Sequence, residues 1–215
     1  MSQNIFLRIV LFGALFSCIA GSASADAVTY DVTVDTSSIT GTAGSLDFNF
    51  NPGPLVVTQA ASLQILNFSS DGSPTGSPTL TGDVAGALPG TLTFDNGTGF
   101  NDYFQDFTFG TTISFDVSLY GPALTAPDEV STSGSTFVFS MFSDAAGTNP
   151  ALTTDTTDGF AFTVDVNLDG TTTVDNFSTD TIVQRVSSVV PEPNSFALLG
   201  TMLIALIVLR RLSAE

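Results

Sequence analysis

Apolar and polar residues alternate along much of this chain, and this period of two restricts its fold more than any other feature. Successive side chains of a β-strand point to opposite faces, so each alternating segment predicts a strand with one buried and one wet face. Antiparallel sheets accommodate such strands. The alternating segments are residues 28–35, 46–50, 92–94, 107–119, 137–139 and 160–168.

Clusters of Pro, Gly, Asn and Asp separate these segments and leave room only for short strands. They are Asn51-Pro52-Gly53-Pro54, residues 71–78, Leu88-Pro89-Gly90, Asp95-Asn96-Gly97, Gly121-Pro122 and Asp169-Gly170. No segment from Asp26 to Val186 has a convincing helical stripe, although residues 59–66 have room for a turn or two of helix.

The pattern predicts an all-β fold, a two-sheet antiparallel β-sandwich that is jelly-roll-like. Most of the 19 phenylalanines lie between Phe48 and Phe177, where they would form the core. A β-helix is the alternative, but the chain has no repeat of fixed period to support it.

The N-terminus has the layout of a signal peptide, residues 1–25. Arg8 precedes an apolar stretch, and Ala23 and Ala25 supply the small residues that signal peptidase accepts, so the mature chain should begin at Asp26. An uncleaved anchor needs a longer apolar run. A lipoprotein site at Cys18 would have an unfavourable neighbour in Phe16.

The C-terminus combines three features: the motif Pro191, Glu192 and Pro193, an apolar run over residues 196–209, and the pair Arg210 and Arg211. Proline cannot continue a helix, so the motif predicts an extended handle beside a transmembrane helix. The apolar run is short for a membrane span, and taken alone it also suits a core helix. Flanking polar residues and snorkelling arginines lengthen the span, and the arginines predict a cytoplasmic terminus.

This order of motif, apolar run and basic pair resembles the PEP-CTERM sorting signal of Gram-negative bacteria, here residues 189–215. The resemblance implies processing at the inner membrane by a protease of the exosortase type, after signal peptidase, and delivery to the cell surface or extracellular matrix. Residues 26–188 would be the ectodomain. Residues 36–53, Asn67-Phe68 and residues 101–104 are similar to a recurring PEP-CTERM ectodomain that has no assigned activity, so they imply no catalytic or binding residue.

The ectodomain is strongly acidic. Between Asp26 and Val190 it has 18 aspartates and Glu129 against Arg185 alone, a net charge of about −18. Such a surface repels nucleic acid and anionic lipid, and favours divalent cations, basic partners or simple solubility.

Missing residue types narrow the chemistry further. The ectodomain has no His, Cys, Trp or Lys, which excludes Ser-His and Cys-His nucleophiles, Schiff-base lysine, His or Cys zinc sites and disulfides. A carboxylate pair of the glycosidase kind is the remaining hydrolytic route. With so many acids no pair stands out, so we predict no catalytic residues, no metal and no enzyme.

Two short segments are candidate binding sites. Aromatic residues follow one another too closely around Tyr103 and Phe104 to share one buried face, so these two are candidate sugar contacts. A loop that folds back and buries them is the alternative.

Asp165, Asn167 and Asp169 match the first half of an EF-hand calcium loop. Its second half fails, because Asn176 stands where a bidentate Glu is needed. A β-hairpin explains the same residues without calcium. A strict two-residue turn would put Val174 on the face opposite Val166, so we expect a three-residue loop or a bulge.

Together these features predict an exported surface or matrix protein associated with exopolysaccharide. A carbohydrate- or calcium-dependent binding module and a carbohydrate-active enzyme with paired carboxylates are the alternatives.

Overall fold

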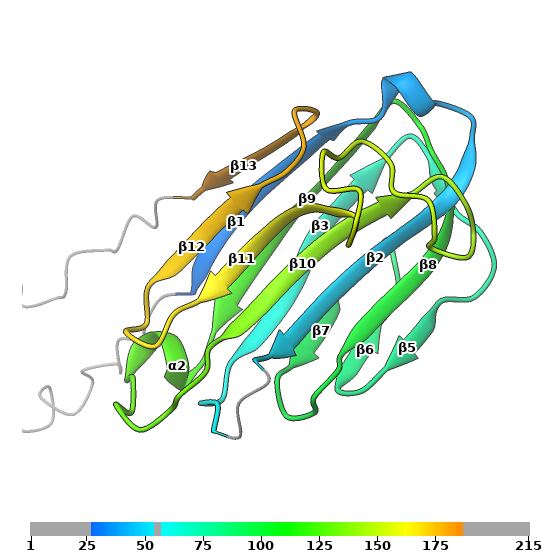
Figure 1. Cartoon of the computed structure of the whole chain (residues 1–215). Coiled ribbons are helices and arrows are strands. Elements are labelled where there is room, and N and C mark those ends of the chain that lie inside the picture. The colour runs from blue at the N-terminus through cyan, green and yellow to red at the C-terminus, as the bar shows by residue number, and fades with distance from the viewer. Residues whose placement is uncertain (1–26, 54–56, 187–215) are drawn as a thin grey trace, which may run out of the picture. The chain divides into compact units, whose positions relative to one another are not determined.

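The computed structural model of the chain describes residues 27–53 and 57–186, and in these residues the fold is all-β, with two antiparallel sheets packed face to face (Figure 1). The expected class is therefore confirmed. The six-stranded sheet has the order β13-β1-β9-β3-β7-β6. Its strands are β1 (Val28–Asp35), β3 (Ser62–Ser70), β6 (Val84–Gly86), β7 (Leu92–Asp95), β9 (Thr112–Tyr120) and β13 (Thr181–Arg185).

The seven-stranded sheet has the order β12-β11-β10-β2-β8-β4, and β5 also pairs with β8. Its strands are β2 (Ala43–Pro52), β4 (Ser73–Pro74), β5 (Thr79–Thr81), β8 (Asp102–Thr108), β10 (Ser135–Phe142), β11 (Phe160–Val166) and β12 (Thr172–Asn176). Consecutive strands often lie in different sheets, as β1, β2 and β3 do; only β10, β11 and β12 form a simple meander.

Helical structure is limited, in the described residues, to a 3-10 turn at Ser37–Ile39 and the short helix α2, Pro122–Thr125. The suggestion of helix at residues 59–66 is wrong, because β3 starts at Ser62 and pairs with both β7 and β9. Pairing on both sides outweighs a weak local preference for helix.

Phenylalanine rings from both sheets form the centre of the core. Phe115 of β9 lies 5.4 Å from Phe48 of β2 and 5.0 Å from Phe139 of β10, measured between ring centroids. Phe162 of β11 is fully buried beside them. Each fully buried ring contributes several kcal/mol, so the core accounts for much of the stability of a chain without disulfides.

Two alternating segments differ from the expectation. Residues 107–119 contain two strands in different sheets, because β8 ends at Thr108 and β9 begins at Thr112. In β11 the register shifts between the pairs Phe139–Phe162 and Ser140–Phe160. This irregularity turns Phe160 out of the core, because directly paired residues share a face.

The hairpin between β11 and β12 has the expected three-residue loop. Asn167 N–H donates to Thr171 O (2.9 Å), and Gly170 N–H donates to Asn167 O (3.0 Å). Gly170 has φ +80°, which a residue without a side chain adopts easily. Val174 pairs with Val164 and so lies on its face of the sheet. Leu168, expected to end the strand, belongs to this loop and is 51 % exposed.

Residues Ala27–Ser187 form a compact unit of their own. Within the described ranges, no helix is long and apolar enough to cross a membrane. The predicted signal peptide, the peptidase site at Ala23 and Ala25, the PEP motif, the apolar run and the arginine pair lie outside the described residues.

Candidate functional site on the outer face of the seven-stranded sheet

Tyr103 is not available to a ligand, so the prediction that it contacts a sugar is wrong. Its side chain points into the core and is fully buried. The phenolic oxygen accepts a hydrogen bond from Leu88 N–H (3.0 Å) and donates one to Gln105 Oε1 (3.1 Å). Burial raises the pKa of Tyr103. The strict alternation of β8 places Tyr103 inside and leaves Phe104 outside.

Phe104 is half-buried on the outer face of the seven-stranded sheet. A Cβ added to Gly147 would stand 2.8 Å from Phe104 Cε2, so the loop between β10 and β11 lies against this ring. The alternative prediction, a loop that folds back over the aromatic side chains, therefore applies in part to Phe104, which this loop partly covers. Phe100, which precedes β8, is 53 % exposed.

The three calcium candidates are engaged in the hairpin. Asp165 accepts a hydrogen bond from Thr136 Oγ1 (2.6 Å), and Asn167 Nδ2 donates to Thr173 Oγ1 (2.9 Å). Asp169 Oδ1 accepts from the hydroxyl and N–H of Thr171, which lower the pKa of Asp169. Among the described residues, no three His, Cys, Asp or Glu side chains gather as a metal-binding group.

A pair of carboxylates that no sequence motif indicated lies on the outer face. Asp47 of β2 and Asp102 of β8 are within hydrogen-bonding reach of each other. Asn49 pairs with Asp102 across the two strands, and its Nδ2 donates to Asp47 Oδ1 (2.7 Å). On its other side Asp47 pairs with Ser140 of β10, and across β8 it pairs with Phe104.

This pair cannot readily carry two negative charges. Burial, followed by the hydrogen bond and the charge of Asp102, raises the pKa of Asp47 to about 8. Burial also raises the pKa of Asp102. Two close carboxylates in a poorly solvated place hold one proton between them at neutral pH.

Several polar groups of this face lack hydrogen-bond partners. Asn49 Oδ1 and Asp102 Oδ1 are buried without a partner, apart from the proton that Asp102 can share with Asp47. Ser140 and Thr163 are only 2 % and 7 % exposed and lie on the same face, but their hydroxyl oxygens are not among the buried atoms that lack a partner. A buried polar group without a partner costs about 1 to 3 kcal/mol. A water, an ion or a ligand can supply the missing partner of such a group.

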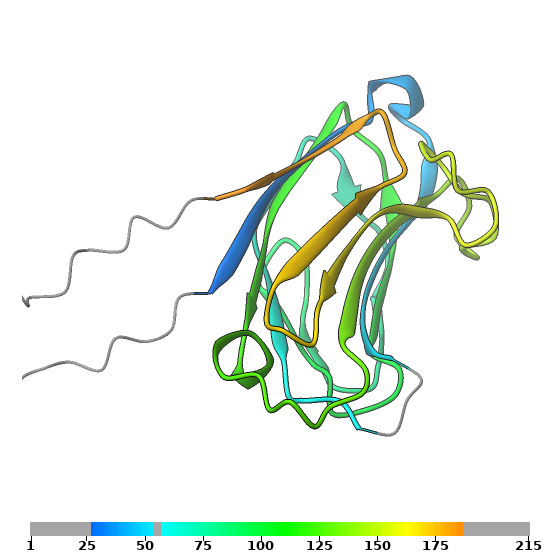
Figure 2. The same cartoon turned by 60° about the vertical axis from the view of Figure 1, so that its left-hand side comes forward.

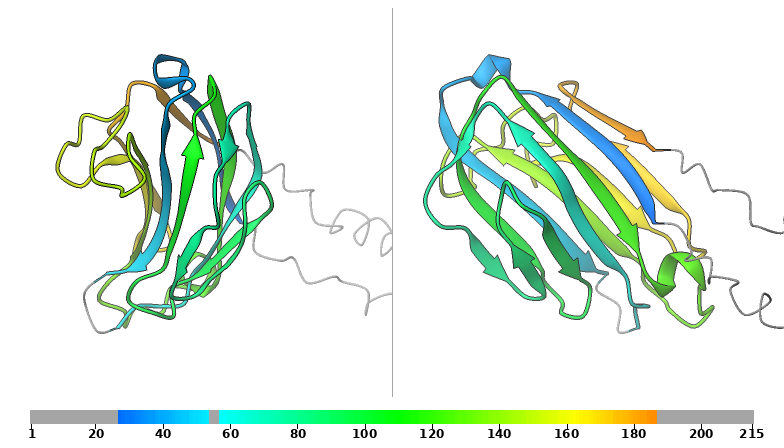
Figure 3. Two further views of the ribbon diagram at one scale, coloured as in Figure 1. Left: turned by 90° about the vertical axis from the view of Figure 1, so that its right-hand side faces the viewer. Right: turned by 180° about the vertical axis from the view of Figure 1, so that it is seen from behind.

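The loop between β10 and β11, residues 143–159, borders one end of this face and projects from the sheet (Figures 2 and 3). Two aspartates hold it in shape. Asp144 accepts from the N–H groups of Ala146 (2.8 Å) and Asn149 (2.7 Å). Asp155 accepts from Thr157 N–H (3.1 Å). The loop therefore forms an ordered border beside Phe104.

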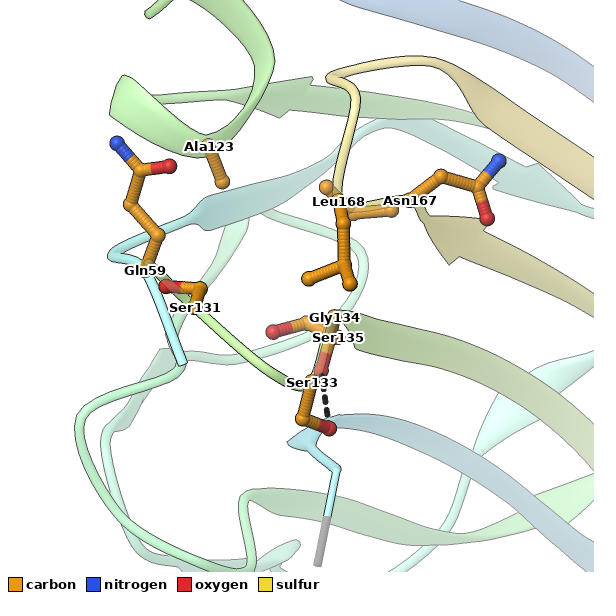
Figure 4. A pocket seen from close by; sticks show the side chains of 9 residues that line it. Gln59, Ala123, Ser131, Ser133, Gly134, Ser135, Asn167 and Leu168 are labelled. Atoms are coloured by element: carbon orange, nitrogen blue, oxygen red, sulfur yellow. Dashed lines mark hydrogen bonds between the residues drawn. The ribbon is translucent and has the colours of Figure 1, made fainter. Parts of the chain in front are cut away.

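The hollow shown in Figure 4 is a different place, beside α2 and the β11–β12 turn. Its lining has no titratable side chain, and it has room for about one water molecule. Leu168 reaches toward Gly134 there, whereas the amide of Asn167 points away (Figure 4). This hollow is too small for an organic ligand.

Comparison with known proteins does not narrow the function: the chain matches no family model, and no curated protein or solved structure is significantly similar to it.

Sequence reasoning missed the residues that the outer face brings together, although one signal was present. β10 is nearly continuously apolar from Phe137 to Phe142, which is typical of a strand covered on both faces. That pattern indicates that the outer face near β10 is partly enclosed. The pairing of β2 with β8 has no such signal, so the meeting of Asp47 with Asp102 was not predictable.

Proposed function

We propose that the chain is an exported protein of the bacterial cell surface or extracellular matrix, whose β-sandwich binds a glycan on the outer face of the seven-stranded sheet. The observation that carries the binding role is the pair of unpartnered oxygens, Asn49 Oδ1 and Asp102 Oδ1, beside the half-buried ring of Phe104. Sugar-binding surfaces combine an aromatic ring for the apolar sugar face with amides and carboxylates for hydroxyl groups.

The strand order supports a jelly-roll interpretation of the sandwich. One sheet contains the order β1-β9-β3-β7, and the facing sheet contains β2 and β8 followed by β4 and β5. This arrangement is that of the double Greek key of a jelly roll. The meander β10–β12 and strand β13 then extend the two sheets. Lectin domains are among the known jelly rolls. This is a likeness of fold alone, and the binding role rests on the site.

The export part of the proposal rests on the sequence of the two ends. Ala23 and Ala25 suit signal peptidase, and the segment from Pro191 to Arg211 has the order of a PEP-CTERM signal. Terminal mapping of the mature protein by mass spectrometry, in surface and membrane fractions, tests it. A mature protein that keeps its C-terminal arginine pair in every fraction would count against exosortase-type processing.

Carbohydrate hydrolysis is less well supported by the carboxylate pair. Glycosidases hold their two carboxyl groups about 5 to 5.5 Å apart for retention and about 6.5 to 9.5 Å apart for inversion. Asp47 and Asp102 are within hydrogen-bonding reach, which leaves no room for a sugar or a water between them. The pair therefore suits binding better than either hydrolytic mechanism.

The binding role is tested with two aromatic variants of the fragment Ala27–Ser187. Phe104→Ala should lower retention on immobilised glycans at least tenfold, because its ring borders the unpartnered groups. Phe100→Ala is the matched control, since Phe100 is an exposed ring of the same segment that lies outside β8. Equal losses in both variants, or a loss in Phe100→Ala alone, would place the site elsewhere. Thermal melting shows whether Phe104→Ala remains folded.

A further inference from the structure

We propose that the glycan bound by this face bears primary amino groups, and that one ammonium group binds at Asp47 and Asp102. The inference rests on the glycan-binding function proposed above and names its ligand class. Three independent features of the face lead to it: the sign of its charge, the kind of hydrogen-bonding atoms left without partners, and a nearly buried hydroxyl beside the pair.

The outer face carries carboxylates and no basic group. Register places five of them on this side of the sheet: Asp47, Asp102, Asp106, Asp165 and Asp175. Arg185 is the only basic residue between positions 27 and 186, and it lies on β13 of the other sheet. Such a face repels uronic acids and sulfated sugars and attracts cationic ones.

The unpartnered oxygen atoms of this face favour a ligand group that donates hydrogen bonds. Asn49 Oδ1 and Asp102 Oδ1 only accept hydrogen bonds. Asn49 Nδ2 is already used by Asp47, which fixes the orientation of the amide. An ammonium group has three donors and no acceptor, so it complements these atoms better than a hydroxyl, which brings both functions. Asn49 Oδ1 and Asp102 Oδ1 are both covered by their neighbours, so both side chains have to rotate for a direct contact, and Asn49 then gives up its hydrogen bond to Asp47.

The burial of Ser140 distinguishes the surroundings of Asp47 and Asp102 from an ordinary acidic surface. Its side chain is more than nine-tenths buried, although the register places it on the outer face beside Asp47. A hydroxyl in that position accepts or donates as the ligand requires. On the opposite side of Asp47, the ring of Phe104 offers an apolar surface for the sugar.

Binding should release a proton. The pair holds one proton at neutral pH because its two charges repel each other and are poorly hydrated. An ammonium group supplies the positive charge instead, so the carboxyl proton leaves to the solvent and both carboxylates become ionised. Neutral sugars have no charge to exchange, so they should bind without this release.

The experiment uses the fragment Ala27–Ser187 in a mildly acidic buffer, where sugar amines are protonated. Calorimetry compares a glucosamine oligomer, its N-acetylated counterpart of equal length and a lysine oligomer, each in two buffers of different ionisation enthalpy. The variants are Asp102→Asn and the control Asp31→Asn, which makes the same substitution at an exposed position on the six-stranded sheet.

We expect the glucosamine oligomer to bind at least tenfold more tightly than the N-acetylated form, with proton release. Asp102→Asn should remove this preference, while Asp31→Asn keeps it. Equal affinity for both oligomers would overturn the ammonium site but leave glycan binding intact. No binding of either oligomer or of other glycans would overturn the glycan-binding function itself. Equally tight binding of the lysine oligomer, or stoichiometric calcium binding lost in Asp102→Asn, would overturn the amino-sugar assignment.

Discussion

Replacement of Asp47 by Asn should stabilise the protein, and the gain should grow with pH. The pKa of Asp47 is raised by burial and by Asp102 from 3.8 to about 8. Between these values the folded protein retains a proton that the unfolded chain has released. Stability therefore falls as pH rises from the lower value to the upper one, and changes little above it.

The size of the effect follows from the same shift. At pH 7 a carboxyl with these two pKa values costs at most roughly 4 kcal/mol relative to a neutral group. Asp47 is partly exposed and coupled to Asp102, so we expect a gain of about 1 to 2 kcal/mol. Asn preserves the local network, because its oxygen accepts from Asn49 Nδ2 and its amide donates to Asp102.

Urea denaturation of the fragment Ala27–Ser187 at several pH values from about 4 to 8 measures this difference. Asp31→Asn is the control for the loss of one charge from an acidic protein, and its effect should not follow the same pH course. A destabilised Asp47→Asn variant at neutral pH, or a gain as large at the acidic end as at neutral pH, would refute the account of the pair.

Four further predictions concern other parts of the chain. Phe162→Ala should cost about 3 to 5 kcal/mol in urea denaturation, because the ring is fully buried between the sheets; a cost below about 1 kcal/mol would contradict the core described here. Asp144→Ala should speed hydrogen exchange at the N–H groups of Ala146, Thr148 and Asn149, which donate to this carboxylate. Burial raises the pKa of Asp144, but the hydrogen bonds from Thr148, Asn149 and Ala146 outweigh it and lower the pKa. The wild-type loop should therefore lose protection only when the solution is acidic enough to protonate Asp144. Added calcium should leave the melting temperature unchanged, because Thr136 and Thr171 each already hold one oxygen of Asp165 and Asp169 in the hairpin; a rise that Asp165→Ala abolishes would establish a metal loop. Replacing Pro191, Glu192 and Pro193 together by alanine should block C-terminal processing in the native host without moving the N-terminus of the mature chain from Asp26, and normal trimming of the variant would contradict the sorting signal.

Strand β8 shows which features of side-chain burial the local sequence pattern predicts and which it does not. Alternation alone puts Tyr103 and Phe107 on one face and Phe104 on the other, and the structure has them so. The crowding of aromatics nevertheless suggested that Tyr103 was exposed. Its hydroxyl has its partners in Leu88 N–H and Gln105, and the Leu88 contact comes from a loop whose approach to β8 no local pattern indicates.

The β11–β12 hairpin was predictable in more detail. Its loop length follows from the requirement that Val164, Val166 and Val174 share a buried face, together with Asp169-Gly170 as turn residues. The irregularity within β11 was not predictable, because the alternation of Phe160 with Phe162 continues through it. Only the pairing with Ser140 shows that Phe160 has left the core.

The sequence by itself determined that the chain forms short antiparallel strands around a phenylalanine core, because period-two alternation and turn residues act within a few positions of each other. It also determined which chemistry is missing between residues 26 and 190, since residue types that are absent cannot be supplied by folding. Only the tertiary structure decided which strands became neighbours. Asp47 and Asp102 are more than fifty positions apart, and their shared proton, like the enclosure of Ser140, arises because β2 lies between β8 and β10. Strand order depends on how the whole core packs, and that information is distributed over the chain.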